Sequence, residues 1–74
     1  MMRIEYKLCI DTVIDEDGNV IKAYGIELRK NGSIEEYIVD ISTNRDRVSL
    51  LINLCNKLNL DPIHIYDVIE DFLL

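Results

Sequence analysis

Residues 3–14, RIEYKLCIDTVI, alternate apolar with mostly polar side chains. Ile4, Tyr6, Leu8 and Ile10 share one side of an extended chain, because successive side chains of a strand point to opposite faces. This period of two predicts a β-strand with one buried face. The chain must therefore build a sheet, and other elements must cover the apolar side of that sheet.

A five-residue loop, residues 15–19, connects this strand to a second strand over residues 20–30. A two-residue turn at Asp17-Gly18 would place Leu8 opposite Glu27, whereas the longer loop places Leu8 opposite Ile26. Burial of one face fixes the register of a hairpin, so the longer loop is predicted. It also pairs residues 14 with 20, 10 with 24 and 6 with 28.

Asn31-Gly32 predicts a second hairpin, because both residues tolerate the positive φ of a type I′ turn. The third strand then covers residues 33–41. A regular ladder from this turn places Ile26 opposite Tyr37 and Tyr24 opposite Val39. The predicted inner face of the sheet consists of Tyr6, Leu8, Ile10, Tyr24, Ile26, Leu28, Tyr37, Val39 and Ile41.

Residues 42–58 have the apolar spacing of a helix, for which Ser42 or Thr43 is the expected N-cap and Thr43 with Asp46 a capping box. The predicted buried stripe is Val48, Leu51, Ile52, Cys55 and Leu58.

A last helix is expected after Asp61, an N-cap, and Pro62, a favourable first helical residue. Its predicted buried residues are Ile65, Val68, Ile69, Phe72 and Leu73. The predicted fold class is α+β: a three-stranded antiparallel β-meander followed by two α-helices packed on one face (βββαα), in a single domain over residues 1–74.

Composition narrows the class of protein. Apolar residues make up 49% of the 74 residues, which argues against disorder, and no apolar run approaches the length of a membrane span. The net charge of −6 disfavours direct nucleic-acid binding. Cys9 and Cys55 have no nearby Cys partner, so we expect reduced thiols in a cytoplasmic protein, with a bridge between them as the alternative. The start of the chain lacks the apolar core of a signal peptide.

The closing stretch LDPIHIYDVIEDFLL, residues 60–74, contains the main candidates for functional side chains. His64, Asp67, Glu70 and Asp71 lie near one another on a helix and include ligands suited to a divalent cation. They also lie opposite the apolar stripe, as a solvated face does. We interpret them as a solvated acidic face, with a docking face for a basic partner as the alternative, and expect no metal or other cofactor.

Other catalytic or metal-binding signatures fail on spacing. The acidic turn DEDGN lacks the glycine and glutamate positions of a calcium loop. His64 is the one imidazole, and pairing it with Cys55 would put a nucleophile in an apolar helix stripe. We therefore expect a protein that is not an enzyme.

The outer face of the sheet is predicted to carry charge pairs, Glu5 with Arg29 and Lys7 with Glu27, next to an apolar patch. An exposed apolar patch marks an interface in many proteins, although a modestly apolar sheet surface is the alternative. The candidate interface consists of Cys9, Val13, Ile21, Ala23, Gly25 and Ile38.

Several stretches resemble a known family: AYGIEL, VDIST, LINLCNKLNLDPIHIYDVIEDFL and the acidic hairpin before them. The chain is similar to small cytoplasmic proteins of Firmicutes, chiefly clostridia and relatives, that are classed as a domain of unknown function. The resemblance implies a bacterial, intracellular setting. It implies no activity, ligand or catalytic residue.

The leading hypothesis is a small non-enzymatic protein-interaction module, a homodimer or a subunit that docks on another bacterial protein. An acidic inhibitor that mimics nucleic acid and occupies a phosphate-binding cleft is the first alternative. A small metal-dependent protein that uses His64 and its acidic neighbours is the second.

Overall fold

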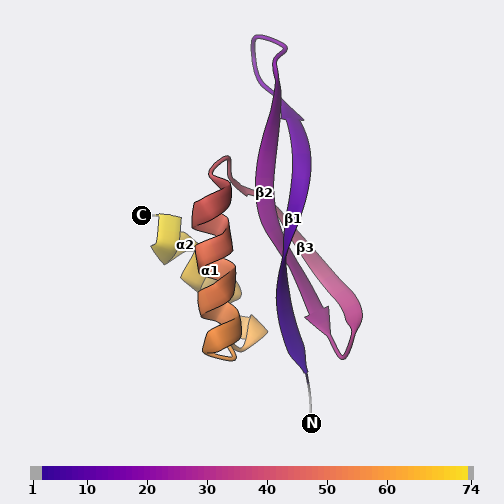
Figure 1. Cartoon of the computed structure of the whole chain (residues 1–74), viewed down its shortest axis with the longest axis vertical. Coiled ribbons are helices and arrows are strands. Elements are labelled where there is room, and N and C mark those ends of the chain that lie inside the picture. The colour runs from indigo at the N-terminus through magenta and orange to yellow at the C-terminus, as the bar shows by residue number, and fades with distance from the viewer. Residues whose placement is uncertain (1–2, 74) are drawn as a thin grey trace.

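The computed structural model describes residues 3–73, which form three strands followed by three helical segments (Figure 1). The elements are β1 (Ile4–Ile14), β2 (Val20–Lys30), β3 (Ser33–Ser42), α1 (Arg45–Lys57), the 3-10 turn η1 (Pro62–His64) and α2 (Ile65–Leu73). The strands make one antiparallel sheet in the order β1-β2-β3, and the helices lie on one side of it. The predicted βββαα fold is confirmed.

The first hairpin has the predicted register. Leu8 lies opposite Ile26 and Ile14 lies opposite Val20, so the loop is residues 15–19. The carboxylate of Asp15 closes this loop by accepting hydrogen bonds from the main-chain N–H of Asp17 and of Asn19. The hydrogen bonds, the one from Asn19 foremost, hold the pKa of Asp15 below its usual value.

The charged residues of the outer face pair along the strands and not across them. Glu5 does lie opposite Arg29, as predicted. The ion pairs, however, join residues two apart along the chain: Arg3, just before β1, to Glu5, and Arg29 to Glu27 within β2.

The second hairpin turns as predicted, but β3 then departs from the predicted register. Asn31 and Gly32 have φ of 52° and 82°, and Lys30 lies opposite Ser33. An irregularity opposite Leu28 and Arg29 shifts the ladder by one residue, so that Ile26 faces Ile38. The predicted inward positions of Tyr37 and Val39 are therefore wrong: these side chains are 54% and 51% exposed, and Ile38 lies in the core instead.

Gly25 explains where β3 bends a second time. A Cβ atom on Gly25 would lie 2.1 Å from the carbonyl oxygen of Ile38 and 3.0 Å from the Cα of Val39. The backbone of β3 thus lies directly against β2 at this glycine. Asp40 takes a positive φ of 55° in the same irregular segment, a conformation that Asp tolerates better than most residues.

Helix α1 begins later than predicted. Its N-cap is Asn44, whose side-chain oxygen accepts a hydrogen bond from the N–H of Arg47, so the predicted cap at Ser42 or Thr43 is wrong. Ser42 instead accepts a hydrogen bond from the N–H of Asn44. Four of the five residues of the predicted buried stripe are buried, and Leu58 is 71% exposed.

The last helix begins as a 3-10 turn. Asp61 is its N-cap, as predicted, and accepts a hydrogen bond from the N–H of Ile63. Ile65 and Ile69 are buried against the core, Val68 and Phe72 are half-buried, and Leu73 is exposed. No helix within the described residues 3–73 is long and apolar enough to cross a membrane.

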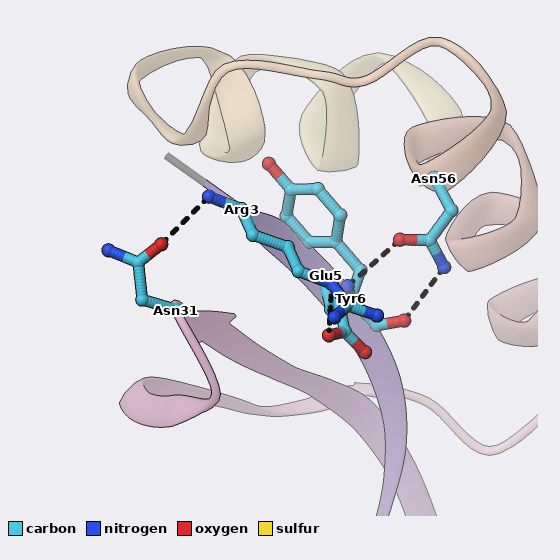
Figure 2. A network of polar contacts seen from close by, with 5 residues as sticks. All are labelled: Arg3, Glu5, Tyr6, Asn31 and Asn56. Atoms are coloured by element: carbon cyan, nitrogen blue, oxygen red, sulfur yellow. Dashed lines mark hydrogen bonds and ion pairs between the residues drawn. The ribbon is translucent and has the colours of Figure 1, made fainter. Parts of the chain in front are cut away.

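Helix α1 is joined to the free edge of the sheet by a polar contact (Figure 2). The side chain of Asn56 hydrogen-bonds both the N–H and the carbonyl of Tyr6 in β1. The hydroxyl of the same tyrosine donates to the carbonyl of Leu60, just beyond α1. Hydrogen bonds of Tyr6 therefore tie β1 to α1 and to the segment after it, at the edge of the core.

The distal half of the β1–β2 hairpin extends beyond the helices (Figure 1). We call residues 10–24 the arm. Because β3 pairs with β2 only as far as Tyr24, the arm is two-stranded over most of its length. The molecule measures 47 Å along its longest axis and 18 Å along its shortest.

Candidate interaction surfaces

An apolar groove separates α1 from α2 on the surface of the helical layer. It has a volume of about 320 Å³ and is lined by Leu51, Leu54, Cys55, Leu58, Leu60, Val68, Asp71 and Phe72. None of these residues belongs to the sheet, so the groove is formed by α1, α2 and the segment that follows α1, which contributes Leu58 and Leu60. Its rim is exposed, with Leu54 at 42% and Leu58 at 71%.

The apolar surface of α1 is wider than its contact with the sheet requires. Leu50, Leu54 and Leu58 follow one another at steps of four, which places them on one side of the helix, and each is exposed. Cys55 lies beneath this ridge, and burial raises the pKa of its thiol. The neutral thiol contributes to the groove as a small apolar side chain.

Arg47 holds the two helices together near the groove. Its Nη2 atom donates a hydrogen bond of 2.9 Å to the carbonyl oxygen of Phe72. Its guanidinium also lies 5.3 Å from the centroid of the Phe72 ring, within range of a cation–π contact. The groove therefore has a preformed wall on its α2 side.

The arm carries a second apolar surface. Ile10, Ile14 and Val20 belong to the face that is buried under the helices lower in the sheet, yet they are 59%, 72% and 70% exposed. Ile10 was predicted to be a buried inner-face residue, and it is exposed and outside the core cluster. The inner face of the arm continues the core face, and beyond Tyr24, which packs against the core, its apolar residues are uncovered.

The predicted outer-face interface is largely inaccessible. Ile38 is part of the core on the helix side, so its predicted place on the outer face is wrong, and Ala23 and Gly25 are buried. Cys9, Val13 and Ile21 are half-buried. The pKa of the Cys9 thiol is raised, first by burial and then by the charges of Glu27 and Asp11. Both cysteines are free thiols.

The predicted acidic face is solvent-exposed. His64 lies in the 3-10 turn, whereas Asp67, Glu70 and Asp71 lie on α2, and all four side chains are exposed. Of these only Asp71 also lines the groove. Residues 3–73 contain no group of three or more His, Cys, Asp or Glu side chains arranged to hold a metal ion.

Comparison with known proteins assigns the chain to a family through one match. A model of a family of unknown function, DUF6514, matches residues 1–74. The chain belongs to the DUF6514 family. No curated protein and no solved structure matches it. Membership in DUF6514 carries no activity with it, so the function of this DUF6514 chain has to be argued from its surfaces.

Sequence reasoning missed the groove and the arm for different reasons. Leu50 and Leu54 already widen the apolar stripe of α1 in the sequence, which is a signal for a second contact surface on that helix. Nothing in the sequence states that the sheet is longer than its helices. That follows only from the structure, in which the loop end of the β1–β2 hairpin extends past α1 and α2 (Figure 1).

Proposed function

We propose that the chain is a non-enzymatic, self-associating protein-interaction module of the bacterial cytoplasm, and that the α1–α2 groove is part of its interface. The groove carries this proposal, since it offers aliphatic side chains, a buried thiol and one carboxylate for contact. Such a lining suits the burial of apolar side chains. The family resemblance supports the bacterial setting.

The exposed area of the chain supports association with a second copy. The accessible surface is 5385 Å² for a mass of 8.6 kDa. A compact monomer of this mass is expected to expose about 4700 Å². The excess of about 700 Å² accompanies an elongated shape, 47 Å by 18 Å, in which the arm leaves apolar residues uncovered for contact with a second copy.

The test is the solution mass, measured by size-exclusion chromatography with light scattering over a range of concentrations in reducing buffer. We expect a dimer of twice the 8.6 kDa chain mass. Replacing Leu54 and Leu58 together by Gln removes apolar rim area, and we expect this variant to be monomeric. Ile63→Gln is the matched control, because Ile63 is 77% exposed and does not line the groove.

Two results would contradict the proposal. A wild-type chain that stays monomeric at every concentration rules out self-association. A dimer that the Leu54→Gln/Leu58→Gln variant leaves as tight as the wild type shows that the groove is not part of the interface. Far-UV circular dichroism of each variant establishes that it is folded.

A further inference from the structure

We propose that two copies of the chain exchange arms, so that the inner face of each arm lies in the α1–α2 groove of the other copy. This inference rests on the proposed self-association and identifies the two surfaces that meet. Each surface is apolar and carries one charge, and the two charges have opposite signs.

The inner face of the arm is mainly apolar and carries one neutral polar residue, Thr12, and one charged residue. Alternation along the strands puts residues 10, 12, 14, 20, 22 and 24 on this face, and Lys22 is the charged residue among these six. Lys22 lies opposite Thr12, between Val20 and Tyr24 on its own strand. Its side chain is exposed and forms no ion pair with another residue of the range 3–73.

The groove has the complementary pattern. Seven of the eight residues that line it are apolar, and the eighth is Asp71. The Asp71 carboxylate is exposed and has no ion-pair partner within the described part of the chain. An apolar strand face with one lysine thus matches an apolar groove with one aspartate.

Charge also disfavours the two simpler symmetric contacts. In a two-fold dimer that packs arm on arm, the Lys22 side chains of the two copies would face the same interface. In a dimer that packs groove on groove, the two Asp71 carboxylates would do so. Like charges brought together at an interface oppose association. Packing arm on groove pairs each lysine with an aspartate, twice per dimer.

The shape of the chain permits this exchange. Strands β1 and β2 pair without a register shift from Ile4 and Lys30 to Ile14 and Val20, so the arm continues the sheet face that carries the helices. The partner's helices can therefore lie on the arm beside the chain's own helices. Each helical layer then lies between its own sheet and the arm of the partner. Because the contact is reciprocal, the assembly closes as a dimer.

The test uses charge reversal at both positions with light scattering and sedimentation as readouts. We expect Lys22→Glu and Asp71→Lys each to raise the dimer Kd about tenfold or more, because each leaves like charges in contact. Combining the two changes again pairs opposite charges, now Glu at position 22 with Lys at position 71. We expect the Kd of this double variant to lie within about threefold of the wild-type value. Lys57→Glu is the matched control: it makes the same charge change on α1, outside the groove lining. It should neither weaken the dimer nor rescue Asp71→Lys.

The outcomes separate this inference from the proposed function. A wild-type monomer overturns both. A dimer whose Kd is unchanged by Lys22→Glu and Asp71→Lys overturns the arm exchange and leaves self-association standing. A double variant as weak as either single variant also overturns the pairing of Lys22 with Asp71. Recovery in the double variant alone, without recovery when Asp71→Lys is combined with Lys57→Glu, supports the exchange.

Discussion

The side-chain amide of Asn56 hydrogen-bonds the main chain of Tyr6 in the way that a neighbouring strand would. Its amide oxygen accepts a hydrogen bond of 2.9 Å from the Tyr6 N–H, and its amide nitrogen donates one of 2.8 Å to the Tyr6 carbonyl oxygen (Figure 2). These two main-chain groups face away from β2 at the free edge of β1. An unpaired strand edge is a template for association with other chains. The Asn56 amide therefore gives both edge groups of Tyr6 a hydrogen-bond partner, and it holds α1 against the sheet.

Replacing Asn56 by Ala should lower the free energy of unfolding by about 1–2 kcal/mol, because both Tyr6 main-chain groups lose a partner in a partly buried place. Chemical denaturation measures this change. Asn53→Ala is the control, since Asn53 is exposed on the same helix and the change in helix propensity is the same. Equal stability of the two variants would show that the bridge to Tyr6 contributes nothing.

Tyr6 makes stability depend on alkaline pH. Burial, with smaller effects of Cys55 and Asp61, raises the pKa of its hydroxyl from 10.0 to about 12. Below pH 10 this hydroxyl is neutral in the folded and unfolded states. As pH rises above 10, the unfolded state loses the proton first, so stability falls until pH passes the folded-state pKa. The loss should reach about 1.4 kcal/mol by about pH 11.

The Tyr6→Phe variant isolates this contribution from the other tyrosines. It removes the hydrogen bond of 2.6 Å to the Leu60 carbonyl and should cost about 0.5–1.5 kcal/mol at neutral pH. Denaturation curves at about pH 9 and about pH 11 should show a smaller pH-dependent loss in the variant than in the wild type. Parallel losses in both proteins would assign the effect to other groups.

The first hairpin and the order of the elements were predictable because each depends on a strong local pattern. Alternation in β1 and β2 allows one register that buries an apolar face, and the structure has that register, with Leu8 opposite Ile26. Asn31-Gly32 likewise fixes its own turn. The register of β3 could not be read in this way, since one extra residue in an irregular strand exchanges its two faces.

Gly25 is the signal that could have exposed this error. A glycine within a strand marks a bulge or the close approach of another backbone. The sequence shows the glycine, but not which strand approaches it or where β3 bends. The placement of Ile38 in the core, and not on the outer face where it was predicted, depends on that detail. The arm was missed because the relative lengths of the sheet and the helices are set by how they pack in three dimensions, which the sequence does not show.

The start of α1 gives a direct contrast between neighbouring residues. Asn44→Ala should lower the free energy of unfolding by about 1 kcal/mol, because it removes the acceptor for the Arg47 N–H at the N-cap. Thr43→Ala should change it by less than about 0.5 kcal/mol, since Thr43 is exposed and precedes the cap. Thermal or urea denaturation of both variants compares them. A larger loss from Thr43→Ala would indicate that the helix begins with the capping box expected from the sequence.

Gly25→Ala should be among the most damaging single changes in the sheet. The added Cβ would lie 2.1 Å from the Ile38 carbonyl oxygen, and the obstacle is main chain that has no side-chain rotamer to change. We expect a loss of about 2 kcal/mol or more in the free energy of unfolding. Gly32→Ala is the control: its Cβ would meet no atom within 4 Å, and its cost comes only from a φ of 82°. Amide NMR shifts should move at residues 37–41 in Gly25→Ala and around the turn in Gly32→Ala. If the Gly25→Ala variant keeps the wild-type stability and the wild-type amide shifts at residues 37–41, β3 does not approach β2 as closely at this glycine as the structure shows.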